Sequence, residues 1–258
     1  MQMCVMRKII FLGVREVKNK LINTSFSVVF PRQAHIRRKA YELEDRLKNL
    51  YLQPEILPVP DEIDPEMPRI IFSSHHGYSQ LIVSQVNIQL TAFYSPDWQE
   101  NMELGKKYFM ERSSLIFNLL DLIGDIKPYF CGITNRAQIN IDTISDKVVL
   151  KQIANTFLKE LSDNTSDIEV KNTKIVDNRF YSNIIVRNFR TWEHNDHQEV
   201  IRLSNKGALK RGIEVICDFN DRYAFNEIEN YFSDKSILNE IIERGFTELN
   251  SVLAQFRE

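Results

Sequence analysis

The chain has 258 residues and a net charge of −2 at pH 7, and 43% of its residues are hydrophobic. That apolar fraction is sufficient for a folded core and excludes a disordered chain. Only 8 residues are glycine, and none lies in a dinucleotide fingerprint or a P-loop, which argues against Rossmann and P-loop nucleotide enzymes. The cysteines Cys4, Cys131 and Cys217 form no metal or disulfide pattern, so we expect reduced thiols and a cytoplasmic location.

The N-terminal half begins with an apolar stretch at residues 1–14, which Arg7 and Lys8 interrupt. This stretch is too short to span a membrane and lacks a cleavage site, so we expect a first strand rather than a signal peptide. Alternating β-rich residues at 25–30 predict the next strand. Apolar residues at three- and four-residue steps predict an amphipathic helix over 32–51.

Five of the prolines fall within residues 54–68 and predict an extended loop, because each proline removes a donor and restrains the preceding residue. Residues 69–94 predict a β-hairpin with a turn at His76 and one long second strand over 79–94. A long helix is expected over 97–123.

The C-terminal half continues this mixture of strands and helices, and we find no internal repeat at a fixed sequence period. Asp177 and Asn178 predict a tight turn, and Ser233 is the expected cap of the last helix. The expected elements are a strand over 129–143, a helix over 145–161, strands over 167–176, 179–192 and 212–219, and a helix over 234–257.

These elements predict an α+β fold. Long antiparallel β-hairpins should form one or two sheets, with one face covered by amphipathic helices. The expected division is an N-terminal half over 1–143 and a C-terminal half over 144–258, with one continuous domain as the alternative.

Charge is distributed unevenly along the chain. Residues 1–50 carry 11 basic and 4 acidic side chains, whereas residues 51–130 carry 5 basic and 11 acidic ones. Arg37, Arg38 and Lys39 form the densest basic run and are candidates for contacts with nucleic-acid phosphates. The alternative is a solvent-exposed helix face whose basic side chains form ion pairs with neighbouring acidic residues.

A second basic set includes Arg187 and Arg190, with Phe189 and Trp192 close by in the sequence. Basic residues interleaved with aromatic ones suit nucleic-acid binding. Alternation along a strand would instead place Arg187 and Arg190 on opposite faces of the sheet, which favours an ordinary structural role.

The pattern most typical of a metal site is His194 and His197 within the polar stretch 193–199. Two imidazoles on one side of a turn could hold a metal ion. No third ligand follows at a characteristic spacing, so a polar surface loop is the alternative. His75 and His76 fall at a predicted turn, where adjacent side chains point in opposite directions.

The order of elements and several short stretches resemble a known group of proteins. The resemblance is carried by the strand QLIVSQVNIQLTAFY, the helix start at Trp98, the stretch GIEVICDF and the terminal amphipathic helix with Phe246. This layout resembles a sporadically distributed family of bacterial proteins of similar length and unknown function. FCGITNRAQINI only approximates the arginine-rich strand usual in that family. The resemblance implies a bacterial cytoplasmic protein and carries over no catalytic residues.

The sequence indicates no catalytic residue and no cofactor. The leading hypothesis is a non-catalytic binding or assembly module of a bacterial cytoplasmic complex, with a protein partner or a homo-oligomer and no membrane contact. The alternative is a nucleic-acid-associated subunit of a defence or toxin–antitoxin system that uses the basic residues above. The second alternative is a metal-dependent hydrolase that uses His194 and His197.

Overall fold

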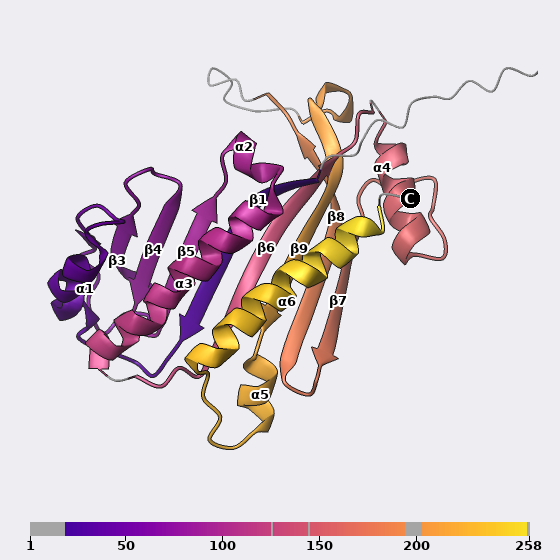
Figure 1. Cartoon of the computed structure of the whole chain (residues 1–258). Helices are drawn as coiled ribbons and strands as arrows, with labels where there is room; N and C mark the ends of the chain where they lie inside the picture. Colours follow the sequence, from indigo (N-terminus) through magenta and orange to yellow (C-terminus); the bar gives the residue numbers. More distant parts are fainter. Residues whose placement is uncertain (1–18, 125, 144, 194–202, 257–258) are drawn as a thin grey trace, which may run out of the picture.

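The computed structural model describes residues 19–124, 126–143, 145–193 and 203–256. Within these ranges, nine strands form one antiparallel sheet in the order β2-β3-β4-β5-β1-β6-β9-β8-β7 (Figure 1). The predicted α+β class with a large antiparallel sheet is therefore confirmed.

The first half contains β1 (Asn19–Val29), η1 (Ile36–Lys39), α1 (Ala40–Leu47), β2 (Glu55–Ile56), β3 (Pro68–Ser73), β4 (Ser79–Ser84), β5 (Asn87–Phe93), α2 (Pro96–Gln99) and α3 (Met102–Gly124). The second half contains β6 (Phe130–Asn140), α4 (Asp146–Phe157), β7 (Glu169–Val176), β8 (Phe180–Thr191), η2 (Asn205–Gly207), β9 (Lys210–Asn220), α5 (Arg222–Glu227) and α6 (Lys235–Ala254).

Apart from β2 and η2, which have no counterparts, the two halves share the same order and pairing of elements. In each half, a first strand and a helical segment lead to a three-stranded meander whose last strand pairs with the first, so β5 pairs with β1 and β9 with β6. A short helix and a long helix then follow, α2 and α3 in one half, α5 and α6 in the other. Because β1 and β6 pair antiparallel at the centre, the fold is a topological repeat with an approximate two-fold axis.

The long helices α3 and α6 lie side by side across one face of the sheet (Figure 1). Alternate residues of the central strands are buried beneath them, including Phe26 on β1 and Ile133 on β6. An ion pair between Lys106 and Glu243 joins the two helices. One hydrophobic core therefore runs through both repeats.

The opposite face of the sheet carries charges that neutralise one another. Glu214 on β9 is only 1% exposed and lies 2.6 Å from guanidinium nitrogens of Arg136 on β6 and of Arg187 on β8. Burial raises the pKa of Glu214, but hydrogen bonds from Gln138, Arg136 and Arg187 outweigh it and leave the pKa below its ordinary value. This ladder of side chains ties the three strands together.

Residues 79–94 form two strands, β4 and β5, so the expected single long strand is wrong. On β4 the buried aliphatic residues are Leu81 and Val83. On β5 they are Ile88 and Leu90, so the buried positions change from odd to even. A continuous strand keeps one parity on each face, and the change marks the turn between the two strands.

Two predicted helices are also altered. The helix expected over 32–51 is limited to η1 and α1, and the helix expected over 97–123 is divided into α2 and α3. The cap of α6 is Asp234, whose carboxylate accepts hydrogen bonds from two backbone N–H groups of the first turn. Ser233, the expected cap, instead donates a hydrogen bond to the buried Asp221.

The turn at Asp177 and Asn178 is confirmed: both residues have the positive φ of the left-handed region, 52° and 49°, and with Arg179 they form the loop between the paired residues Val176 and Phe180. One sheet spans both sides of the expected division between residues 143 and 144. The strand expected within residues 1–14 lies outside the described residues.

Candidate ligand-binding pocket

A cavity of about 330 Å³ lies in the first repeat, where the β3–β4 turn, the end of β5, α2 and α3 meet. This volume is at the lower end of the range of roughly 300–1,000 Å³ for small-molecule sites. The cavity is lined by Ser74, His76, Tyr78, Ala92, Phe93, Tyr94, Ser95, Trp98, Tyr108 and Arg112.

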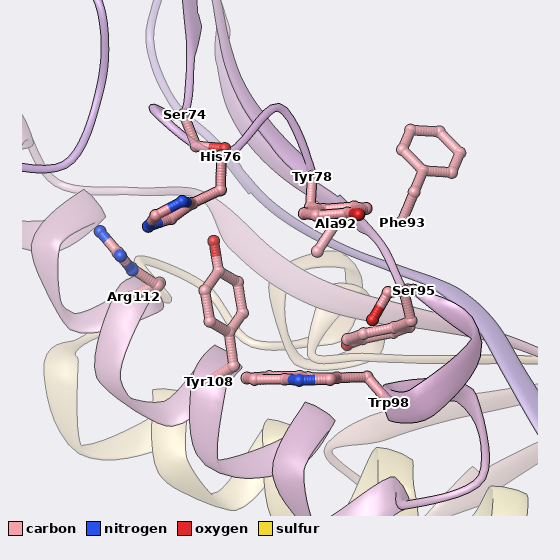
Figure 2. Close-up of a pocket in the computed structure, with 10 residues that line it drawn as sticks. Ser74, His76, Tyr78, Ala92, Phe93, Ser95, Trp98, Tyr108 and Arg112 are labelled. Carbon is pink, nitrogen blue, oxygen red and sulfur yellow. The ribbon is translucent and has the colours of Figure 1, made fainter.

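Two aromatic rings form opposite walls of the cavity. Figure 2 shows Tyr78 from the β3–β4 turn on one side and Trp98 from α2 on the other, while Phe93 points away. Tyr78 is 56% exposed and Trp98 is 38% exposed. Two solvent-exposed aromatic side chains on facing walls of a cavity can hold a planar group between them.

The local sequence explains the position of Trp98. The chain turns at Ser95, and Pro96 occupies the first position of α2, where its fixed φ and missing N–H are tolerated. The backbone N–H of Trp98 donates to the Ser95 carbonyl at 2.9 Å. Tyr108 on α3 then packs edge-on against Trp98, with 6.2 Å between ring centroids. Trp98 is therefore held between the turn and the long helix.

Arg112 provides the fixed charge of the cavity lining. It lies one turn after Tyr108 on α3, and its guanidinium carbon is 5.3 Å from the Tyr108 ring centroid and 5.8 Å from that of Tyr51. Its Nη1 atom is buried without a hydrogen-bond partner, and no carboxylate of the described residues lies within ion-pairing distance of it. Buried N–H donors are normally paired, so this guanidinium has a donor available for an anionic partner. Figure 2 shows it beside His76, at one end of the cavity.

Burial disfavours ionisation of two tyrosines in this region, Tyr51 and Tyr94. Burial, with a smaller effect from Tyr108, raises the pKa of Tyr51 to about 12 although Arg112 opposes the shift. Burial also raises the pKa of Tyr94, although a hydrogen bond with Thr24 opposes the shift. The hydroxyls of Tyr108 and Ser79 are 2.6 Å apart. Tyr51 and Tyr94 therefore provide no phenolate near neutral pH that would compensate the charge of Arg112.

The predicted basic run lies outside this cavity lining. Arg37 pairs with Asp61 at 2.9 Å, and Lys39 pairs with Glu42 at the same distance. Arg38 is exposed on the same helical turn. Two of the three cations thus have acidic partners, as in the solvated-face interpretation.

Arg187 and Arg190 lie on opposite faces of the sheet, as strand alternation predicts. Arg187 is on the open face beside Glu214. Arg190 lies against the start of α4, 3.1 Å from Asp146 and 2.6 Å from Asp167. The two arginines therefore do not form one basic patch.

His194 and His197 lie outside the described residues. Within the described ranges, no three His, Cys, Asp or Glu side chains gather as a metal site would require. At the β3–β4 turn, a ring nitrogen of His75 is 3.0 Å from the Lys48 carbonyl, while His76 lines the cavity. None of the described helices combines the length and apolar character needed to cross a membrane.

Comparison with known proteins adds no relative: no protein-family model matches the chain, and no curated protein is detectably similar to it. The candidate site therefore rests on the geometry of the pocket.

Proposed function

We propose that this chain is a non-catalytic binding module whose ligand is a small planar aromatic molecule held in the pocket. The observation that carries the proposal is the pair of open aromatic walls, Tyr78 and Trp98, on either side of a cavity of about 330 Å³. A ring inserted between them would remove apolar surface from water on both of its faces. The polar groups at one end of the cavity would fix its orientation.

Isothermal titration calorimetry with 2-naphthylacetamide and 2-naphthylacetate tests this proposal. We expect one molecule to bind per chain, and Trp98→Ala to weaken binding about tenfold, since stacking contributes roughly 0.5–1.5 kcal/mol beyond simple burial. Tyr78→Ala should have a similar effect. The bound probe should also raise the melting temperature, because it stabilises only the folded state.

Tyr41→Ala is the matched control. Tyr41 is 68% exposed on α1 and does not line the cavity, so its removal should leave binding unchanged. The proposal fails if neither naphthyl compound binds the wild-type chain, or if Tyr41→Ala weakens binding as much as Trp98→Ala.

A further inference from the structure

The repeat within the fold supplies an internal comparison for Arg112. The long helices α3 and α6 occupy equivalent places in the two halves. Buried positions recur along them with the same spacing: Phe109, Ser113 and Phe117 on α3, and Ile241, Gly245 and Leu249 on α6. In this alignment Arg112 corresponds to Arg244, and Tyr108 corresponds to Glu240.

Arg244 shows how the second repeat satisfies a guanidinium at this position. It stacks on an aromatic ring, with 5.2 Å to the Phe180 centroid. It also makes an ion pair with Glu240, one turn earlier on α6, at 2.8 Å. Asp177 in the β7–β8 turn makes a second ion pair with it at 2.5 Å. The ring provides a stacking surface, and two carboxylates neutralise the charge.

Arg112 has the stacking surface without the carboxylates. Tyr108 stands where the second repeat has Glu240, and the adjacent β3–β4 turn contributes His76 to the cavity lining rather than an acid. The buried Nη1 atom of Arg112 has no partner. The first repeat therefore lacks the anion that the second repeat supplies from its own chain, and the cavity lies at the place where it is missing.

We infer that the ligand is a planar aromatic carboxylate, whose carboxylate pairs with Arg112 while its ring lies between Tyr78 and Trp98. This assignment rests on the proposed function. A carboxylate matches the planar donor fork of a guanidinium and the single fixed charge of the cavity lining. A phosphate monoester carries a charge of about −1.5 to −2 and would exceed that charge.

The test compares 2-naphthylacetate with its neutral isostere 2-naphthylacetamide, by calorimetry on the full chain. The acetate should bind about 10- to 100-fold more tightly, the range expected for hydrogen bonds to a charged group. Arg112→Gln should abolish this preference, so that the acetate and the acetamide bind the variant with similar affinity. Arg244→Gln, the equivalent change in the second repeat, should keep the preference.

A second variant keeps Arg112 in place and instead neutralises its charge. His76→Asp places a carboxylate in the β3–β4 turn, as Asp177 does in the other repeat, so Arg112 would be neutralised from within the chain. We expect the ratio of acetate affinity to acetamide affinity to fall toward one in this variant. His75→Asp adds the same charge to the neighbouring exposed residue, outside the cavity lining, and should keep most of the preference.

The outcomes separate the two proposals. If acetate and acetamide bind wild type equally, the carboxylate assignment is wrong but the aromatic site remains. If neither binds, the proposed function fails and this inference fails with it. Tighter binding of 2-naphthyl phosphate than of the acetate would also overturn the assignment in favour of a phosphate ligand.

Discussion

Asp221 is a carboxylate buried at the end of β9. It accepts hydrogen bonds from the Cys131 backbone N–H and the Tyr231 hydroxyl, both at 2.7 Å, and from Ser233. Burial is the largest influence on its pKa and leaves it above the ordinary value despite these donors. Asp221 therefore joins the start of β6 to the segment before α6, and its carboxyl group is harder to ionise than that of an exposed aspartate.

This raised pKa predicts a specific pH dependence of stability. Between the ordinary and the raised pKa, the folded state binds more protons than the unfolded state, so the free energy of unfolding falls as pH rises through that interval. Asp221→Asn removes this contribution, so between pH 4 and pH 7 its free energy of unfolding, measured with urea, should fall less or rise more than that of wild type. Asp163→Asn, on the exposed loop after α4, should behave like wild type. Equal slopes for wild type and Asp221→Asn would contradict the prediction.

At the scale of elements, the close approach of α6 to the sheet depends on Gly245. A Cβ atom placed there would lie 2.4 Å from Cγ2 of Ile133 on β6. Gly245→Ala should therefore force the helix away and lower the free energy of unfolding by about 1–3 kcal/mol, the usual cost of overpacking. Gly207→Ala is the matched control, because nothing lies within 4 Å of its added Cβ. Denaturant unfolding measures both, and equal stabilities would show that α6 is not packed this tightly.

The sequence predicts most elements because their periodicity is local. The hairpin of β7 and β8 follows from alternation and from Asp177 and Asn178, which adopt the left-handed conformation that such turns need. The boundary between β4 and β5 does not follow from the sequence, because the apolar run continues through it. Only the parity of the buried positions, odd at Leu81 and even at Ile88, marks the turn.

The pocket is harder to predict, because the sequence around each of its residues is typical of an ordinary core or turn position. The spacing of Tyr108 on α3 is that of a buried helix face, and His76 is an ordinary turn residue. Five aromatic residues fall between Phe93 and Phe109 inclusive in the sequence. This concentration is the one sequence feature that points to an aromatic site. Whether such residues fill a core or leave a cavity depends on how the β3–β4 turn meets α2, and periodicity carries no information about that contact.

At the scale of the whole molecule, the open face and the free edge of the sheet have different characters. Charges on the open face are paired across strands, as for Glu214 with Arg136 and Arg187, so the face has no strong field of one sign. The edge strand β7 carries Lys171 and Lys174 among largely exposed side chains. Lysines on an edge strand disfavour pairing with another sheet. Of these three features, the pocket is therefore the one that offers a ligand a complementary surface.

The continuous sheet predicts that both repeats unfold together. β1 and β6 pair from Asn19↔Ile139 to Val29↔Phe130, and a single core lies beneath them, so neither repeat can unfold without exposing apolar surface of the other. The chain has one tryptophan in each repeat, Trp98 and Trp192. Trp192→Phe leaves fluorescence that reports on the first repeat, and Trp98→Phe leaves fluorescence that reports on the second. In each single-tryptophan variant, the fluorescence midpoint in guanidinium chloride should coincide with that of far-ultraviolet circular dichroism. A fluorescence transition separated from the dichroism transition would mean that the repeats are independent units and that the β1–β6 contact contributes little to stability.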